Sequence, residues 1–395
     1  MKSKMFLLFI FSFVLGCAQM GEKHSQNNSD SLKNTSDSVR NYPGSAEDTA
    51  NGLIIPTGKM QSARAAHTAT ILKSGKVLIA GGFASSALRG AEIYDPALKT
   101  FSSVGQMSAA RSGHTATLLP NGQVLIAGGY NGSYLSSTEI FDPQTQTFSP
   151  GPVMNIPRSG HTATVLNNRK ILFAGGVGVG WSFLQSAELY DIQTNTFAST
   201  GSMTTARESH TATLLKNGNV LIVGGHKGRR TNISIYSSAE LYDPVSQNFK
   251  LIGNMSIIRH KHDATRLTDG SVLITGGSDE RDSRGTYISA ELYDPVSSSF
   301  KPAANMNISR YKHNGTSILL PNGNVLIAGG ANRVEIYQTG AGKFVLVYGR
   351  IGTERLFSCA TLLQSGEVLI TGGYNENQET SAASWLYVYK KVSRE

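Results

Sequence analysis

The sequence predicts an all-β fold made of seven copies of one four-stranded unit. The chain of 395 residues contains 42 Gly, 15 Tyr and 15 Phe, and only 16% of its residues are charged. Runs such as Val-Leu-Ile-Ala-Gly-Gly are typical of buried strands, and no helical periodicity accompanies them. A motif that opens with arginine recurs at intervals of 45 to 52 residues, which suits a four-stranded unit better than a helical repeat. The seven arginines are Arg64, Arg111, Arg158, Arg207, Arg259, Arg310 and Arg355.

The second repeat shows how each unit begins. Arg111 to His114 leads into a first strand from Thr115 to Leu119, and Pro120 to Gly122 forms a turn because Asn-Gly favours tight hairpins. A second strand from Gln123 to Ala127 ends at Gly128-Gly129, where the missing side chains allow close backbone approach. Six further pairs stand in register and begin at Gly81, Gly175, Gly224, Gly276, Gly329 and Gly372.

The second half of each unit supplies two more strands. Glu139 opens the third strand in Glu-Ile-Phe-Asp-Pro, and the fourth runs from Phe148 towards Met154. Paired glycines after the second strand, Tyr-Asp-Pro after the third and an aromatic residue opening the fourth resemble the kelch repeat, over residues of about 53 to 390. Membership of that family implies a seven-bladed β-propeller. Phenylalanine stands where eukaryotic kelch repeats usually carry Trp, at Phe101, Phe148, Phe197, Phe249, Phe300 and Phe344.

Counting strands predicts how the ring closes. The phenylalanine-led fourth strand occurs six times, and the last third strand, Leu386 to Tyr389, is followed by only six residues. Ile54 to Met60 precedes Arg64 at the spacing found before the second arginine. We therefore expect an N-terminal strand to complete the seventh blade, which would remove an open sheet edge.

The N-terminal region predicts export and a lipid anchor. Lys2 and Lys4 precede an apolar stretch, Phe6 to Leu15, that is too short to span a bilayer. The stretch ends in Val-Leu-Gly-Cys17, which resembles the bacterial lipobox and implies diacylation of Cys17; a signal peptide with an incidental cysteine is the alternative. The residues that follow lack the Asp that retains enterobacterial lipoproteins at the inner membrane, which implies the outer membrane. The expected organisation is a signal peptide (1–16), a lipidated polar tether (17–52) and a propeller (53–395).

Cysteine number and charge narrow the possible partners. Once Cys17 carries lipid, Cys359 is the only other cysteine and no internal disulfide can form. The formal net charge of +9 falls to +7 when Lys2 and Lys4 leave with the signal peptide. The basic residues are scattered, so we expect no nucleic-acid partner and a membrane contact only through the lipid.

Six of the arginines have a glutamate counterpart at the start of the third strand. Their common register suggests buried bidentate ion pairs within a blade or between neighbouring blades. A ring of arginines that binds an anion at the channel mouth is the alternative. The glutamates are Glu92, Glu139, Glu188, Glu240, Glu291 and Glu335.

A histidine follows each of the first six arginines by three residues, and Ser358 takes this place in the last repeat. Imidazoles that converge on an axis could bind a metal ion. Six equivalent positions are too many for one ion, so we interpret them as hydrogen-bond partners of a neighbouring blade and predict no metal site. They are His67, His114, His161, His210, His262 and His313.

The sequence shows no catalytic motif, so we predict no catalytic residue and no cofactor. Galactose oxidase has a similar propeller that holds copper, and a resemblance to it would imply a Tyr cross-linked to Cys, a second Tyr and two His. Only Cys359 is available, at the position of Thr68 and Thr115, which indicates a small buried residue. Secreted kelch sugar epimerases have six blades. A carbohydrate-active enzyme, galactose oxidase-like or epimerase-like, remains the alternative, and acidic or imidazole groups from several blades converging at the channel mouth would favour it.

Loop variation predicts the binding face. The two short turns of each blade must lie on one face, so the variable loop between the second and third strands emerges on the other. This loop holds Trp181 in the third blade and Lys227, Arg229, Arg230 and Tyr236 in the fourth, residue types that often anchor interfaces. We expect a protein or glycan of the cell envelope to bind there. Loops that vary only because nothing constrains them are the alternative.

Overall fold

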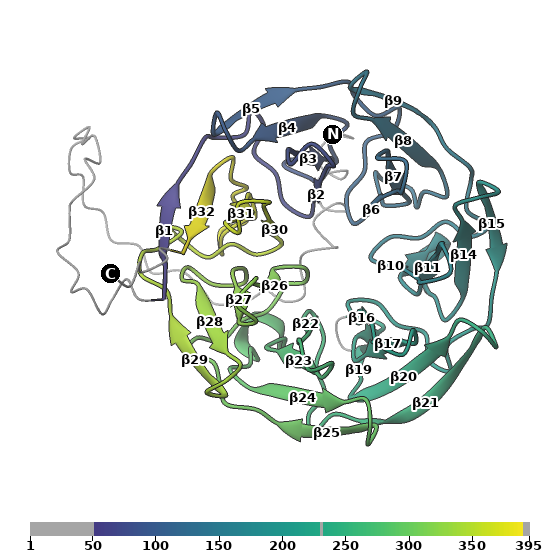
Figure 1. The fold of residues 1–395 in the computed structure, drawn as a ribbon. Helices are drawn as coiled ribbons and strands as arrows, with labels where there is room; N and C mark the ends of the chain where they lie inside the picture. Colours follow the sequence, from purple (N-terminus) through teal and green to yellow (C-terminus); the bar gives the residue numbers. More distant parts are fainter. Residues whose placement is uncertain (1–50, 230–231, 390–395) are drawn as a thin grey trace, which may run out of the picture.

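Seven four-stranded antiparallel sheets surround a central axis (Figure 1). This is a computed structural model, and it describes residues 51–229 and 232–389. The predicted seven-bladed β-propeller is confirmed. Within each blade the first strand lies nearest the axis and the fourth lies at the outer rim. In the described part of the chain, no helix is long and apolar enough to cross a membrane.

The first three blades follow one another along the chain. Blade 1 contains β2 (Thr68–Ile71), β3 (Val77–Ala80), β4 (Ala91–Asp95) and β5 (Thr100–Ser103). Blade 2 contains β6 (Thr115–Leu118), β7 (Val124–Ala127), β8 (Thr138–Asp142) and β9 (Thr147–Pro150). Blade 3 contains β10 (Thr162–Val165), β11 (Lys170–Ala174), β14 (Ala187–Asp191) and β15 (Thr196–Ser199).

The remaining blades repeat this order, and only the seventh departs from it. Blade 4 contains β16 (Thr211–Leu214), β17 (Val220–Val223), β20 (Ser238–Asp243) and β21 (Asn248–Asn254). Blade 5 contains β22 (Asp263–Arg266), β23 (Val272–Thr275), β24 (Ala290–Asp294) and β25 (Ser299–Pro302). Blade 6 contains β26 (Ser317–Leu319), β27 (Val325–Ile327), β28 (Glu335–Gln338) and β29 (Lys343–Leu346). Blade 7 contains β30 (Cys359–Leu362), β31 (Val368–Thr371), β32 (Ser384–Val388) and β1 (Leu53–Pro56).

The second strand of each blade is buried on both faces. In β7, Val124 and Ile126 pack against Leu78 of blade 1. Leu125 of the same strand packs in the opposite direction, against Ile171 of blade 3. Because each second strand contacts both neighbouring blades, it is apolar along most of its length and does not alternate.

The phenylalanines that open the fourth strands stack on an aromatic residue of the third strand. The ring centroids of Tyr94 and Phe101 are 4.8 Å apart, and those of Phe141 and Phe148 are 4.9 Å apart. Blades 3 to 6 hold the same pair at 4.8 to 5.1 Å. Phenylalanine therefore fills this position in a tilted aromatic contact without an indole ring.

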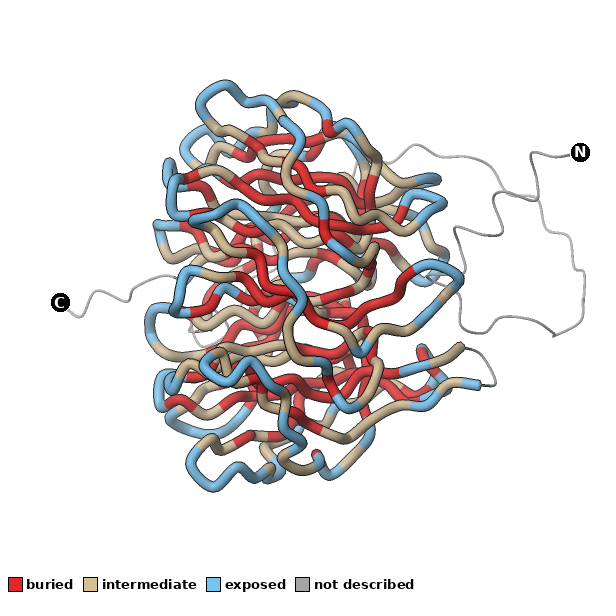
Figure 2. Tube along the Cα trace, turned by 90° about the vertical axis from the view of Figure 1, so that its right-hand side faces the viewer, coloured by how far each residue is buried: buried red, intermediate tan, exposed pale blue. Residues whose placement is uncertain are grey.

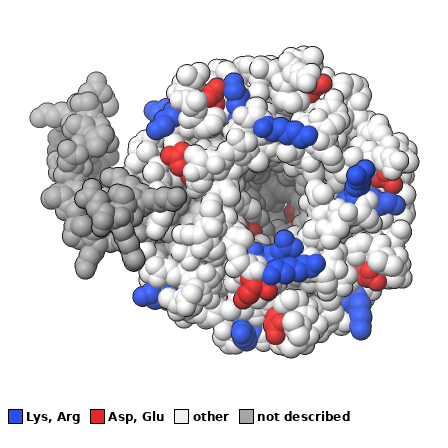
Figure 3. All heavy atoms as spheres, viewed as in Figure 1, with Lys and Arg blue, Asp and Glu red and all other residues white. Residues whose placement is uncertain are grey.

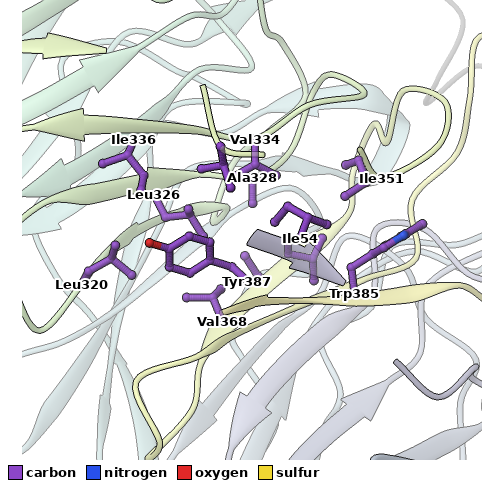
Figure 4. Packing of buried hydrophobic residues seen from close by; sticks show 13 residues of the cluster. Ile54, Leu320, Leu326, Ala328, Val334, Ile336, Ile351, Val368, Trp385 and Tyr387 are labelled. Carbon is purple, nitrogen blue, oxygen red and sulfur yellow. The ribbon is translucent and has the colours of Figure 1, made fainter. Parts of the chain in front are cut away.

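The N-terminal strand closes the ring, as predicted. β1 pairs antiparallel with β32, so that Ile54 lies opposite Tyr387 and Pro56 lies opposite Trp385. Figure 4 shows Ile54 between these side chains and the apolar residues of blade 6. The strand ends at Pro56, and Met60, which we had included in it, is buried in the next cluster between blades 7 and 1.

The paired glycines fit where neighbouring blades come closest. A Cβ on Gly81 would lie 2.6 Å from the carbonyl oxygen of Arg111 and 2.7 Å from the ring of His114, both in the next blade. A Cβ on Gly82 would lie 2.6 Å from the carbonyl oxygen of Ala65 in its own blade. Both glycines have positive φ, so a side chain is excluded here by contact and by conformation.

Six arginines form buried ion pairs within their own repeats. Arg111 Nη2 donates to Glu139 Oε1 at 2.8 Å, while Nη1 donates to the Gly128 carbonyl at 2.7 Å. The second carboxylate oxygen accepts the backbone N–H of Ser108 at 2.7 Å. Each pair therefore has one ion contact, and the predicted bidentate geometry is wrong because the other guanidinium nitrogen and carboxylate oxygen bind the backbone. The six guanidinium groups are at most 1% exposed, so they do not form an anion site at the channel mouth.

The seventh arginine replaces the ion pair with an aromatic contact. Trp385 occupies the glutamate position of β32, since it lies opposite Ile370 as Glu139 lies opposite Ile126. The guanidinium carbon of Arg355 lies 5.3 Å from the centroid of the Trp385 ring. A cation–π contact thus takes the place of the carboxylate.

The six repeated histidines bind the neighbouring blade, as interpreted from the sequence. His114 Nε2 lies 3.2 Å from the Thr68 hydroxyl of blade 1, and the same contact recurs in blades 3 to 5. Where the strand opens with Asp263 or Cys359 instead of Thr, the end of the next strand supplies the hydroxyl. His313 then binds Thr275 at 3.1 Å and His67 binds Thr371 at 2.9 Å.

Candidate functional site

The loops between the second and third strands, here called the 2–3 loops, lie on the same face as the segments that join successive blades. Figure 2 shows the ring from its side, with the buried strands in a band between two exposed faces. In Figure 3 the face turned towards the viewer is hollowed at its centre. Two of the 2–3 loops form small hairpins, β12 (Val177–Gly178) with β13 (Ser182–Phe183) in blade 3 and β18 (His226–Lys227) with β19 (Ser234–Ile235) in blade 4. The 3-10 helices η2 (Val179–Trp181) and η4 (Asp282–Arg284) lie in the loops of blades 3 and 5.

Three 2–3 loops bring aromatic and basic side chains into contact. The guanidinium carbon of Arg229 lies 3.0 Å from the centroid of the Trp181 ring. Tyr134 meets the same ring edge-on at 5.6 Å, and Tyr130 lies 6.2 Å from it. We call Tyr130, Tyr134, Trp181 and Arg229 the aromatic–arginine cluster. Its members come from blades 2, 3 and 4, and Trp181, Tyr134 and Arg229 are half-buried.

Of the other predicted binding residues, the structure describes Lys227 and Tyr236, which do not join this cluster. Lys227 is exposed on β18. Tyr236 lies apart, with its ring 5.4 Å from the guanidinium carbon of Arg207. Arg230 falls outside the described residues. Among its described members, the predicted set therefore contains one contacting pair, Trp181 and Arg229, and the two tyrosines that complete the cluster were missing from it.

A circle of backbone hydrogen bonds surrounds the axis on this face. It passes through the residue two positions after each repeated arginine, and all seven have φ between 48° and 64°. In the described structure, six of their N–H groups donate to the same position of the preceding blade at 2.8 to 3.4 Å. The residues of this axial circle are Ala66, Gly113, Gly160, Ser209, Lys261, Lys312 and Phe357.

Blades 5 and 6 place two lysines of the axial circle on one carboxylate. Lys261 Nζ lies 2.7 Å from Asp282 Oδ1, and Lys312 Nζ lies 3.6 Å from Asp282 Oδ2. The Lys312 ammonium also lies 4.8 Å from the Tyr311 ring and 5.6 Å from the Tyr374 ring. Burial lowers the pKa of Lys312 to about 7, with Lys261 as a further cause.

Blades 4 and 5 contribute a second group of titratable side chains. His226 Nδ1 lies 3.1 Å from His260 Nδ1, and His226 Nε2 lies 3.6 Å from Glu208 Oε2. Glu208 extends over Gly160, since a Cβ on that glycine would lie 2.6 Å from Glu208 Oε1. Burial raises the pKa of Glu208 to about 7 and lowers that of His226 to about 3.

The sequence analysis did not identify the lysines, histidines and carboxylates near the axis, although the sequence contains a signal for them. The arginine and histidine that frame each four-residue segment repeat, while the two residues between them change from blade to blade. In blade 2 they are Ser112 and Gly113, whereas in blade 5 they are His260 and Lys261. The variation of these two residues inside an otherwise constant segment could have identified them. The repeat fixes where they lie relative to the axis, but not which residue types they are.

The half-buried Cys359 does not fit the copper chemistry of galactose oxidase. Cys359 donates a hydrogen bond from its thiol to the His67 carbonyl at 3.0 Å. Burial raises the pKa of the thiol to about 12. This environment holds the side chain between blades 7 and 1 as a small half-buried group, and it is a poor place for a residue that must be cross-linked to a tyrosine.

Comparison with known proteins agrees with the geometry. Residues 95–277 match the family model described as the KLHDC2/KLHL20/DRC7 Kelch-repeats domain. A solved structure described as a novel fungal alcohol oxidase with catalytic diversity among the AA5 family, in complex with copper, is similar with a TM-score of 0.66. The match has 15% sequence identity, covers 86% of this chain and 76% of that chain, and concerns the fold alone. No curated protein matches the sequence. Residues 95–277 are therefore a kelch-repeat domain, and they form part of a seven-bladed β-propeller.

Proposed function

We propose that this protein is a binding scaffold of the cell envelope whose propeller captures a protein or glycan partner on the face of the 2–3 loops. The observation that supports this most is the aromatic–arginine cluster. Trp181, Tyr134 and Arg229 are far apart in sequence and come from three blades, yet they lie in contact on one face. Trp, Tyr and Arg are the residues that most often dominate binding energy, and loops on a rigid scaffold are where binding sites concentrate.

The envelope location rests on the N-terminal sequence. Cys17 and the tether lie outside the described residues, so the lipid anchor and the outer-membrane location remain part of the proposal. A lipid on Cys17 would hold the propeller at the membrane while the 2–3 loop face meets its partner.

A capture experiment tests the binding face. We expect the triple variant Trp181→Ala, Arg229→Ala and Arg230→Ala to lose capture of envelope proteins or glycans and to melt at the wild-type temperature, because Trp181 and Arg229 do not belong to the buried core. Matched control variants alter the turns of the opposite face at Asn121 or Asp142 and should retain capture. If capture survives the triple change but is lost after the turn changes, the partner binds the opposite face and the proposed face is wrong.

A carbohydrate-active enzyme is a second candidate, favoured by one observation. Glu208, His226 and His260 bring acidic and imidazole groups from two blades together near the axis. A carboxyl group with a pKa of about 7 is suited to proton transfer near neutrality. A screen for turnover of reducing sugars would test this, with Glu208→Gln as the inactive variant. Binding that the triple variant abolishes, with no turnover by the wild type, would favour the scaffold.

A further inference from the structure

Two imidazoles from neighbouring blades meet in the buried part of the 2–3 loop face. The Nδ1 atoms of His226 and His260 are 3.1 Å apart, and the ring planes are inclined by 81°. The residues are only 6% and 1% exposed. Ring nitrogens at this distance either share a hydrogen, when the N–H of one ring donates to the bare nitrogen of the other, or share a metal ion.

The outer nitrogen of each ring indicates where the hydrogens lie. His260 Nε2 is 3.3 Å from the Asp279 carbonyl oxygen, which can only accept, so this nitrogen carries the hydrogen. His226 Nε2 faces Glu208 Oε2 at 3.6 Å, and the ionised form of this carboxyl group favours N–H on that nitrogen too. Both Nδ1 atoms then present lone pairs to each other.

This arrangement matches the way proteins prepare histidine ligands. Metal-bound histidines usually donate their second N–H to a carboxylate or a backbone carbonyl, and Glu208 and Asp279 supply one of each. Two nitrogens that lie about 2.0–2.1 Å from one ion, at roughly a right angle, are about 3 Å apart from each other. Ser278, whose backbone pairs with that of His260, is fully buried, and its hydroxyl has no hydrogen-bond partner in the described structure.

We propose that the Nδ1 atoms of His226 and His260 bind one late first-row divalent metal ion in an open site. Imidazole suits Zn²⁺, Cu²⁺ and Ni²⁺. Within residues 51–229 and 232–389, no group of three or more His, Cys, Asp or Glu side chains could hold a metal ion. The protein thus supplies two ligands, and water or a bound partner completes the coordination. This inference goes beyond the proposed binding function and does not depend on it.

The charged side chains around the two histidines have opposing effects on metal binding. Burial is the first cause that lowers the pKa of both rings; Lys261 lowers both further, and Arg229 lowers that of His226. Metals bind the neutral form of imidazole. The same cations repel a divalent ion, and the carboxylate of Glu208 opposes them. The charge of Glu208 should therefore tune the affinity.

Titration of the metal-free full-length protein with Zn²⁺ by calorimetry tests the site. We expect the wild type to bind one ion per chain and His226→Ala or His260→Ala to abolish this binding. Glu208→Gln should weaken it by about 10- to 100-fold, as is typical for partners of ligating histidines. The matched control is His24→Ala, which removes a histidine outside the described residues and should leave binding unchanged.

A spectroscopic measurement on the wild type avoids variants that fail to fold. The X-ray absorption spectrum of the zinc-loaded protein should show two imidazole ligands. The proposal is overturned if Zn²⁺ does not bind, if binding survives both histidine changes in folded protein, or if the spectrum shows no imidazole. Nitrogen NMR can also detect a proton shared by the two Nδ1 atoms. If excess Zn²⁺ leaves the signal of that proton unchanged, the proposal is overturned as well.

Discussion

The buried scaffold is nearly the same around the whole ring, whereas the residues at the axis differ from one side to the other. Six arginines make the same contacts in six blades, and six histidines reach the preceding blade. The axial circle instead holds Ala66, Gly113 and Gly160 in blades 1 to 3 but Lys261 and Lys312 in blades 5 and 6. The contacts that repeat from blade to blade therefore fix the geometry of the ring. The positions that differ between blades are where the charged and titratable side chains lie.

Loss of ring closure should have the largest effect. Deletion of residues 53–60 removes β1, exposes the edge of β32 and opens the apolar cluster around Ile54. We expect cooperative unfolding to be lost or the melting temperature to fall sharply, as measured by circular dichroism or calorimetry. A truncated chain that melts at the wild-type temperature would show that the ring does not depend on this strand.

Removal of one scaffold carboxylate should cost about 3–5 kcal/mol, because it leaves a buried charge unpaired. Glu240→Gln strands the guanidinium of Arg207, which is 0% exposed. Arg355→Met in blade 7 is the comparison, since it removes a cation–π contact worth about 0.5–2 kcal/mol and leaves no carboxylate behind. Urea unfolding of both variants measures the difference. Equal losses would contradict the distinction between the six paired arginines and the seventh.

The stability of the fold should depend on pH through a group near the axis, and not through the repeated ion pairs of the scaffold. The pKa of Glu208 is raised by burial from its ordinary value of 4.5 to about 7. Between these values the unfolded chain has lost the proton and the folded chain retains it, so stability falls as the pH rises from 4.5 to 7, by up to about 3 kcal/mol. Unfolding of the metal-free protein at several pH values should show this slope in the wild type and not in Glu208→Gln. A slope that persists in the variant would assign it to another group.

The smallest effect concerns the repair of a scaffold contact. Thr68→Val removes the hydroxyl that binds His114 and should cost about 1 kcal/mol. Ala80→Thr in the same chain places a hydroxyl where Thr275 and Thr371 stand in blades 5 and 7, and should recover part of the loss. Thermal melting of the single and double variants measures the recovery. A double variant that is less stable than Thr68→Val would indicate that the threonines are not interchangeable.

The repeat made the fold predictable, and its limits explain what was missed. Arg111, Glu139 and His114 stand in a constant register, so their structural roles follow from repetition alone. The bidentate geometry was wrong because backbone groups of the inter-blade segment, which carry no sequence signal, occupy half of each ion pair. The pairing of His226 with His260 could not be derived from the sequence, because it depends on two loops that the repeat does not constrain. Trp181 and Arg229 were predicted as binding residues because of their residue types. Their contact could not be predicted, because it depends on the conformations of loops that the repeat does not constrain.

The axial circle has an electrostatic consequence. Its peptide groups follow one another head to tail around the axis, so their dipoles circulate and largely cancel, unlike those of a helix, which add along one direction. The backbone therefore gives this mouth of the channel little net polarity of its own. Attraction or exclusion of a charged molecule at the axis is left to side chains, with Lys261 and Lys312 on one side and bare glycine positions on the other.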